Sequence, residues 1–321
     1  MKLGTIGSGK IVQEMLRAIE PIEEVTCVAA YSRKQETADA LAGDFQIPKT
    51  YTSLEAFFSD EELDTVYIAS PNKLHMKQAL QALENKKHVI CEKPFTPTAK
   101  EAKELKKAAK ENNVFVFEAI PTLFLPNFIE LSNHIERLGP IRLIQCNYSQ
   151  YSSRYDQLKA GEVTNIFDPA FAGGALADIN VYNLHFVLRL FGKPSEVVYK
   201  ANLFENGVDT SGIALLSYPG FQASCVGSKD TAGENFVSIQ GEDGYMYIKP
   251  GANGARSVKI TIDGKTKDIS VKQDRARLTY EFIHFNRIIQ NNNREVFEEL
   301  IDHTIAVAEV LEDARGQAGL S

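Results

Sequence analysis

Two closely spaced glycines near the N-terminus could let the backbone approach a negatively charged ligand. The run Gly7-Ser8-Gly9-Lys10-Ile11 follows a strand-like stretch and opens a helix-like one. The first glycine permits a tight turn, and the second lets a pyrophosphate come close to the helix N-terminus, which stabilises its charge. Val12 stands where this motif usually has a third Gly or Ala, so an ordinary glycine-rich turn is the alternative. The strand-turn-helix context favours a dinucleotide site.

The end of the next predicted strand distinguishes between the two nicotinamide dinucleotides. NAD binding usually places an acidic residue there, about 20 residues beyond the glycines, to hold the ribose 2′-hydroxyl. This chain has Ser32, Arg33 and Lys34 instead. A hydroxyl and two cations suit a 2′-phosphate, because arginine presents a planar fork of donors to phosphate oxygens. We therefore predict NADP(H) rather than NAD(H), with a solvated basic loop as the alternative.

Two further polar segments each follow a predicted buried strand. Ser70, Asn72 and His75 come after one strand, and Glu92 and Lys93 come after the next. Ligands of open α/β sheets bind just beyond the carboxyl ends of the strands, so these residues are candidate ligand contacts. The alternatives are a surface lysine at 93 and a histidine at 75 that merely packs on its own helix.

A third group of candidate residues lies in the second half of the chain. Asp178 and Tyr182 are four positions apart within a predicted helix over Gly173–Phe191, so their side chains share one face, and His185 shares it as well. A tyrosine hydroxyl can act as a general acid or base. The alternatives are a dipole-favoured acid at a helix start, a core tyrosine and a packed histidine.

Short apolar segments and helical segments alternate through residues 1–120. The predicted strands are Leu3–Ile6, Val25–Tyr31, Thr65–Ala69, His88–Cys91 and Val114–Glu118. The predicted helices between them are Lys10–Ile19, Gln35–Phe45, Ser53–Phe58, Asn72–Asn85 and Thr98–Asn112. This alternation is typical of a parallel sheet covered by helices on both faces. We predict an α/β fold whose first domain is a doubly wound Rossmann sheet that binds the dinucleotide.

Residues 121–321 show a different pattern. Closely spaced strand-like segments follow the helix at 173–191, and the chain ends in helical segments at 278–291 and 295–314; the strands are 141–151, 196–202, 209–217, 221–227, 234–240, 245–248 and 258–262. Close spacing predicts a mostly antiparallel sheet in an α+β domain that binds substrate. Such a sheet can leave one face open, so we predict a homodimer or homotetramer formed through it.

Four ordered motifs together give a resemblance to a known family. The glycine loop, the Pro-Asn-x-x-His segment ending at His75, the triplet Glu92-Lys93-Pro94 and the segment 173–182 resemble those of the glucose–fructose oxidoreductase/inositol dehydrogenase (Gfo/Idh/MocA) family, over nearly the whole chain. The resemblance implies that Asn72 and Glu92 lie near the nicotinamide ribose and amide. It implies that Lys93 points its ammonium at the substrate oxygen, that Asp178 positions substrate hydroxyls or the lysine, and that Tyr182 or Lys93 handles the proton.

The chain also departs from the pattern of that family. Leu123 occupies the usual place of an arginine, Ala172 and Asn180 replace glycines, and the chain has no tryptophan. These changes bear on substrate recognition rather than on cofactor chemistry. As further substrate contacts we predict four residues of the loop before the helix, which are Arg154, Tyr155, Asn165 and Phe167.

Bulk properties exclude several classes of protein. The net charge of −7 argues against general binding to nucleic acid, which needs a basic face. No apolar run approaches about 18 residues and no signal peptide is visible, so we predict a cytoplasmic protein without a membrane segment. The four cysteines are dispersed, which indicates neither a metal site nor a disulfide framework.

The predicted function is NADP(H)-dependent hydride transfer to or from a hydroxyl or carbonyl carbon of a small sugar, polyol, diol or related compound. One alternative is an enzyme of the same fold that uses a tightly bound nicotinamide transiently. The other is a non-catalytic NADP(H) sensor, which would have no need of Lys93, Asp178 or Tyr182.

Overall fold

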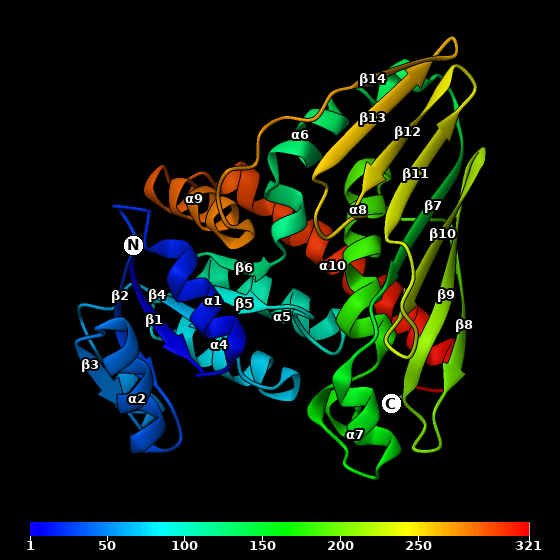
Figure 1. The fold of residues 1–321 in the computed structure, drawn as a ribbon. Coiled ribbons are helices and arrows are strands. Elements are labelled where there is room, and N and C mark those ends of the chain that lie inside the picture. The colour runs from blue at the N-terminus through cyan, green and yellow to red at the C-terminus, as the bar shows by residue number, and fades with distance from the viewer. Residues whose placement is uncertain (321) are drawn as a thin grey trace. The chain divides into compact units, whose positions relative to one another are not determined.

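The computed structural model describes residues 1–320 and divides into two compact units, of which the first comprises Met1–Ala119 and Arg275–Ile305 and the second Ile120–Asp274 and Ala306–Ser321 (Figure 1). The long helix α10 (Arg294–Ala318) passes from the first unit into the second. The division differs from the predicted one, because residues 275–305 join the N-terminal unit. None of the helices within residues 1–320 combines the length and apolar character needed to cross a membrane.

The first unit contains a six-stranded, fully parallel sheet in the order β3-β2-β1-β4-β5-β6. Its strands are β1 (Lys2–Ile6), β2 (Thr26–Tyr31), β3 (Lys49–Tyr51), β4 (Thr65–Ile68), β5 (His88–Glu92) and β6 (Val116–Ala119). Its helices are α1 (Lys10–Ile19), α2 (Gln35–Phe45), α3 (Leu54–Phe58), the 3₁₀ turn η1 (Asn72–Leu74), α4 (His75–Glu84), α5 (Ala99–Glu111) and α9 (Arg277–Gln290). All residues of β4 and β6 are buried, so both sheet faces are covered, which confirms the predicted Rossmann-type sheet.

Aromatic packing explains why residues 275–305 belong to the first unit. Phe285 of α9 stacks on Phe117 of β6 with ring centroids 4.5 Å apart, and Phe282 lies 5.8 Å from Tyr67 of β4. The hydroxyl of Thr279 donates to the carbonyl of Ala18 at the end of α1 over 2.7 Å. These rings pack α9 directly on β4 and β6, so residues 275–305 belong to the core of the first unit.

The second unit contains an eight-stranded sheet in the order β14-β13-β12-β11-β7-β10-β9-β8, in which only the β7–β10 pair is parallel. Its strands are β7 (Ile141–Ser149), β8 (Glu196–Leu203), β9 (Asp209–Tyr218), β10 (Phe221–Ser228), β11 (Phe236–Gly241), β12 (Gly244–Lys249), β13 (Ser257–Ile262) and β14 (Lys265–Asp268). Its helices are α6 (Pro126–Ser132), α7 (Ser153–Lys159), the π-helix Leu176–Asn180 and α8 (Val181–Phe191). The predicted mostly antiparallel sheet is confirmed.

Among the described residues of the second unit, helices cover one face of this sheet and leave the other open. Helix α8 packs against β7 and β10, and α6 packs against β13 (Figure 1). The burial of β9 and β12 alternates along each strand, as expected for a sheet with one covered and one open face. The covered face positions the π-helix and α8, which carry Asp178 and Tyr182.

Candidate active site

The glycine loop between β1 and α1 has the geometry of an anion cradle. Gly7 has φ +117°, and a Cβ there would lie 2.7 Å from the carbonyl oxygen of Ala69. Gly9 is the N-cap of α1 and supplies no side-chain acceptor for the first helical N–H groups. Nothing lies within 4 Å of a Cβ placed on Gly9. The open helix N-terminus, flanked by Ser8, Lys10 and Ile11, therefore suits a pyrophosphate.

The basic segment after β2 begins beside this loop. Ile6 of β1 and Tyr31 of β2 are paired, so the Gly7 loop and Ser32 leave neighbouring strands at the same edge. The side chains of Arg33 and Lys34 are exposed, and neither forms an ion pair with a carboxylate of residues 1–320. The structure thus offers two cations without acidic partners where a 2′-phosphate would need them.

His75 ties together two loops at the carboxyl edge of the first sheet. It is fully buried, with Nε2 at 2.8 Å from the carbonyl oxygen of Ser70 and Nδ1 at 3.1 Å from that of Pro94. Burial lowers the pKa of His75. The ring therefore holds the loops that carry Asn72 and Lys93 and does not itself face a ligand. The predicted helix Asn72–Asn85 begins differently in the structure, because Asn72 opens the 3₁₀ turn η1 and α4 begins only at His75.

Glu92, the last residue of β5, belongs to a buried polar group. The Tyr67 hydroxyl donates to Glu92 Oε1, and the Lys93 backbone N–H donates to Oε2 over 3.3 Å. Burial raises the pKa of Glu92. Behind this pair, Glu281 of α9 is fully buried with no hydrogen bond to either carboxyl oxygen within residues 1–320. Burial, and then the charge of Glu92, raise the pKa of Glu281 well above its ordinary value.

In the second unit, two glycines allow the segment that carries Asp178 to fold tightly. A Cβ on Gly173 would lie 2.5 Å from the carbonyl oxygen of Ile166, and one on Gly174 (φ +117°) would lie 1.8 Å from Asp209 Oδ1. Asp209 Oδ2 accepts from the Leu176 N–H and from the Tyr199 hydroxyl, both over 2.7 Å. A buried carboxylate therefore holds the N-terminus of the π-helix. The predicted regular helix over 173–191 is interrupted here, and π-turns of this kind are frequent at functional sites.

Asp178, on the π-helix, forms an ion pair with Lys229, which follows β10. The side chain of Asp178 is 28% exposed and that of Lys229 only 9%. Tyr182 is nearly buried, with its ring 5.8 Å from that of Tyr148 in an edge-on arrangement. His185 is fully buried on α8, where its side chain cannot face substrate directly.

The four predicted loop contacts have different surroundings. Arg154 and Asn165 are exposed, on α7 and on a 3₁₀ turn respectively. Tyr155 packs against a small core formed by Phe167, Leu158 and Val208. Phe167 is fully buried in that core, so the structure assigns it to packing rather than to substrate contact.

The structure accounts for one departure from the family pattern, Asn180, and shows the backbone conformation at another, Ala172. Asn180 donates from Nδ2 to the carbonyl of Cys225 over 2.9 Å, and Gly227 leaves room for it, because a Cβ on Gly227 would lie 2.6 Å from that of Asn180. Ala172 adopts φ +52°, a left-handed conformation that favours glycine. We found no structural reason for the leucine at 123, which is buried.

Sequence reasoning did not identify four residues of these sites, namely Tyr67, Asp209, Lys229 and Glu281. Lys229 could have been found, since it follows a predicted strand as Lys93 does. The other three act from inside elements that looked purely structural. Within residues 1–320, no three His, Cys, Asp or Glu side chains are grouped so that they could hold a metal ion.

Comparison with known proteins places the chain in a family. Residues 1–120 match the family described as "Oxidoreductase family, NAD-binding Rossmann fold" and residues 134–247 match the GFO/IDH/MocA C-terminal domain. The chain is 36% identical over 320 residues to a scyllo-inositol 2-dehydrogenase (NADP(+)) of Bacillus subtilis, covering 100% of this chain and 98% of that protein. It is 27% identical to a trans-1,2-dihydrobenzene-1,2-diol dehydrogenase of Xenopus tropicalis, covering 100% and 98%.

Solved structures share the fold. An aldose–aldose oxidoreductase from Caulobacter crescentus superposes with a TM-score of 0.88 at 20% identity, over 99% of this chain and 97% of that one. The 3-ketoreductase KijD10 from Actinomadura kijaniata gives 0.87 at 20% identity over the same shares. The predictions of an oxidoreductase and of the family are confirmed: the chain belongs to the Gfo/Idh/MocA family of NAD(P)-dependent oxidoreductases.

Proposed function

We propose that the protein is an NADP(H)-dependent dehydrogenase or reductase that acts on a CH–OH carbon of a small polyol, sugar or related diol. Two features together support the proposal. The helix that follows Gly7 and Gly9 has no side-chain cap at its N-terminus, and the segment Ser32-Arg33-Lys34 after β2 contains two cations and no acidic residue. The identity of 36% to an NADP(+)-dependent scyllo-inositol 2-dehydrogenase supports both the cofactor and the substrate class.

The residues of the first unit fit NADP. The glycine loop would hold the pyrophosphate, and Ser32, Arg33 and Lys34 would hold the 2′-phosphate. Ser70, Asn72 and Glu92 are proposed near the nicotinamide end, with His75 supporting their loops from behind. The nicotinamide supplies a hydride donor or acceptor, while the chain supplies orientation and charge.

The proton and the substrate oxygen are assigned to side chains. Lys93 donates a hydrogen bond to the oxygen that changes oxidation state and so stabilises negative charge that develops there. Tyr182 or Lys93 gives or takes the proton. Asp178 accepts hydrogen bonds from substrate hydroxyls. Arg154, Tyr155 and Asn165 remain predicted substrate contacts.

Replacing Arg33 with alanine tests the choice of cofactor. We expect the KM for NADP to rise by about 10–100-fold, since a charge-assisted hydrogen bond to phosphate is lost, while the KM for NAD changes by less than about threefold. Steady-state kinetics with both cofactors measures this. Arg17→Ala, which removes an exposed arginine from the far end of α1, is the matched control and should leave both constants unchanged. A wild-type preference for NAD would contradict the proposal.

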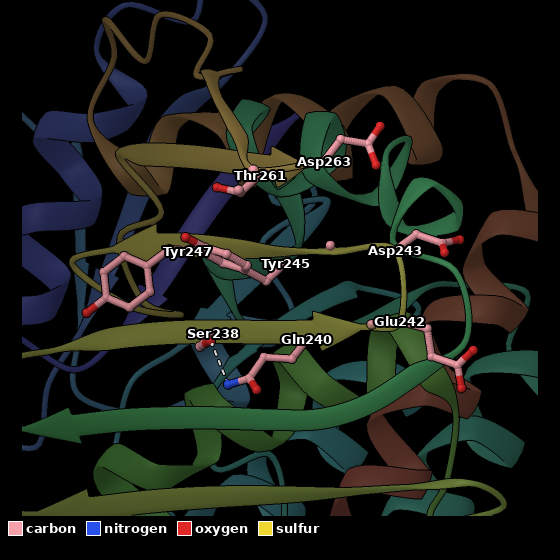
Figure 2. A pocket seen from close by; sticks show the side chains of 11 residues that line it. Ser238, Gln240, Glu242, Asp243, Tyr245, Tyr247, Thr261 and Asp263 are labelled. Carbon is pink, nitrogen blue, oxygen red and sulfur yellow. Dashed lines mark hydrogen bonds between the residues drawn. The ribbon is translucent and has the colours of Figure 1, made fainter.

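We further propose that the open face of the second sheet joins copies of the chain into a homodimer or homotetramer. This face exposes large apolar side chains, and it carries a pocket of about 760 Å³ beside Tyr245, Tyr247 and Gln240 (Figure 2). Ile213 and Leu215 of β9 are 44% and 47% exposed. Large apolar side chains exposed on an open sheet face are typical of a subunit interface.

Sedimentation equilibrium tests this assembly. Wild type should have two or four times the 35.6 kDa mass of the chain, and the double variant Ile213→Lys/Leu215→Lys should shift toward the monomer, because it places like charges on the face. A wild type that sediments as a monomer at micromolar concentration would contradict it. The predicted cytoplasmic location stays a prediction.

A further inference from the structure

Lys229 is held in one place by the end of β10. Its backbone N–H donates to the carbonyl of Thr210 over 2.8 Å, which continues the pairing of β10 with β9. Its side chain is 9% exposed and its ammonium donates to Asp178 Oδ2. The position of this ammonium is therefore set by a strand end and by the π-helix together.

The neighbouring acid does not neutralise Lys229. Asp230 follows it directly in the chain, but the Asp230 carboxylate accepts from the hydroxyls of Thr210, Ser211 and Ser228, over 2.7, 3.0 and 2.8 Å. The lysine instead reaches a carboxylate 51 residues earlier in the chain. Of the two acids near the end of β10, Asp178 and Asp230, Lys229 pairs with Asp178. Asp178 is also the residue that we assign to substrate hydroxyls.

The Lys229 ammonium has more N–H donors than it has acceptors among the described residues. A lysine has three N–H donors, and within residues 1–320 Asp178 is the single acceptor of Lys229 Nζ. A nearly buried donor without an acceptor is costly, so such groups usually find a ligand or a water molecule. The ammonium therefore retains donors that a ligand oxygen can use beside Asp178.

The charges of the pair indicate which ligand. A carboxylate accepts hydrogen bonds and an ammonium donates them, and together they carry no net charge. Two adjacent hydroxyl groups match such a pair, since one donates to Asp178 while the oxygen of the other accepts from Lys229. Asp178 would repel a substrate carboxylate. A substrate with a single hydroxyl could bond to only one of the two side chains, either Asp178 or Lys229.

We propose that Lys229 is a specificity-determining residue, which with Asp178 binds two neighbouring hydroxyls and makes the enzyme prefer vicinal diols to isolated alcohols. This inference rests on the proposed dehydrogenase function and names the part of the substrate that the site reads. A merely structural ion pair would hold the π-helix to β10 without distinguishing between substrates.

The test compares two ring alcohols that differ by one hydroxyl. With NADP(+), kcat/KM is measured for trans-1,2-cyclohexanediol and for cyclohexanol, in wild type and in Lys229→Met. We expect kcat/KM for the diol to fall by about 10–100-fold, mainly through KM, beyond any change for cyclohexanol. Lys229→Met also removes the cation that pairs with Asp178, and this indirect effect should lower kcat/KM for both alcohols by the same factor. The ratio of kcat/KM for the diol to kcat/KM for cyclohexanol therefore reports only the direct contact of Lys229 with the second hydroxyl.

Controls separate folding from recognition. Lys249→Met, which removes an exposed lysine paired with Glu234 on the same sheet, should leave the ratio unchanged. If Lys229→Met does not fold, as judged by thermal unfolding and NADPH fluorescence, Lys229→Gln replaces it. An equal loss for both alcohols would overturn the role of Lys229 while leaving the dehydrogenase intact. A wild type that oxidises neither ring alcohol nor scyllo-inositol would instead overturn the proposed function, and this inference with it.

Discussion

Lys93→Met is expected to lower kcat by about 10²–10⁴-fold while the enzyme still binds NADPH, because methionine keeps the length of the side chain and removes the ammonium. The residue follows the last position of β5, and its backbone N–H is held by Glu92 over 3.3 Å. In the proposed role, the ammonium would stabilise negative charge on the substrate oxygen as that charge develops. Losing it should affect turnover far more than binding.

The measurements for Lys93→Met are kcat with scyllo-inositol and the dissociation constant of NADPH from fluorescence titration. Lys100→Met is the matched control, since Lys100 is an exposed residue of α5 in the same unit. The control should retain full turnover. A kcat for Lys93→Met within about tenfold of wild type would show that the ammonium does not act on the reacting oxygen.

Gly174→Ala should reduce the free energy of unfolding by about 3–5 kcal/mol, the sum of two separate penalties. The first is conformational, since φ +117° is a region that residues with a Cβ rarely adopt. The second is steric, since the new Cβ would lie 1.8 Å from Asp209 Oδ1. Asp209 cannot move away without releasing the Leu176 N–H at the start of the π-helix.

Urea unfolding monitored by circular dichroism measures the loss. Gly43→Ala is the matched control, because Gly43 lies within helix α2 and nothing lies within 4 Å of a Cβ placed there. Alanine should stabilise that helix by about 0.5–1 kcal/mol. A Gly174 variant as stable as wild type would mean that the Gly174 backbone and the Asp209 carboxylate are not arranged as described.

Strong local patterns made most elements predictable. The predicted helix Lys10–Ile19 has the bounds of α1, and the central strands are recognisable because short apolar runs, such as Val89–Cys91 in the predicted strand His88–Cys91, are typical of buried parallel strands. Two strands were not predicted, Lys49–Tyr51 and Lys265–Asp268. Both lie at the edge of a sheet and consist largely of polar residues, so neither shows the apolar pattern by which strands are recognised.

The parts that were not predicted depend on contacts between distant residues. The assignment of 275–305 to the first unit follows from rings such as Phe285 and Phe117, which meet only in the fold. The π-helix arises because Asp209 holds Leu176 from another element. The pairing of Lys229 with Asp178 has no local signal, although the lysine lies at a strand end, as Lys93 does. Roles of candidate residues could be proposed from motifs, but their partners could not.

The first unit is built from two separate pieces of chain, 1–119 and 275–305. A gene fragment that encodes only the N-terminal piece would make a sheet that lacks the rings of Phe282 and Phe285. If one contiguous gene segment were swapped between relatives to exchange cofactor preference, this sheet would therefore lose the helix α9 that packs on it. Preference is more safely transferred by point changes in the short turn after β2.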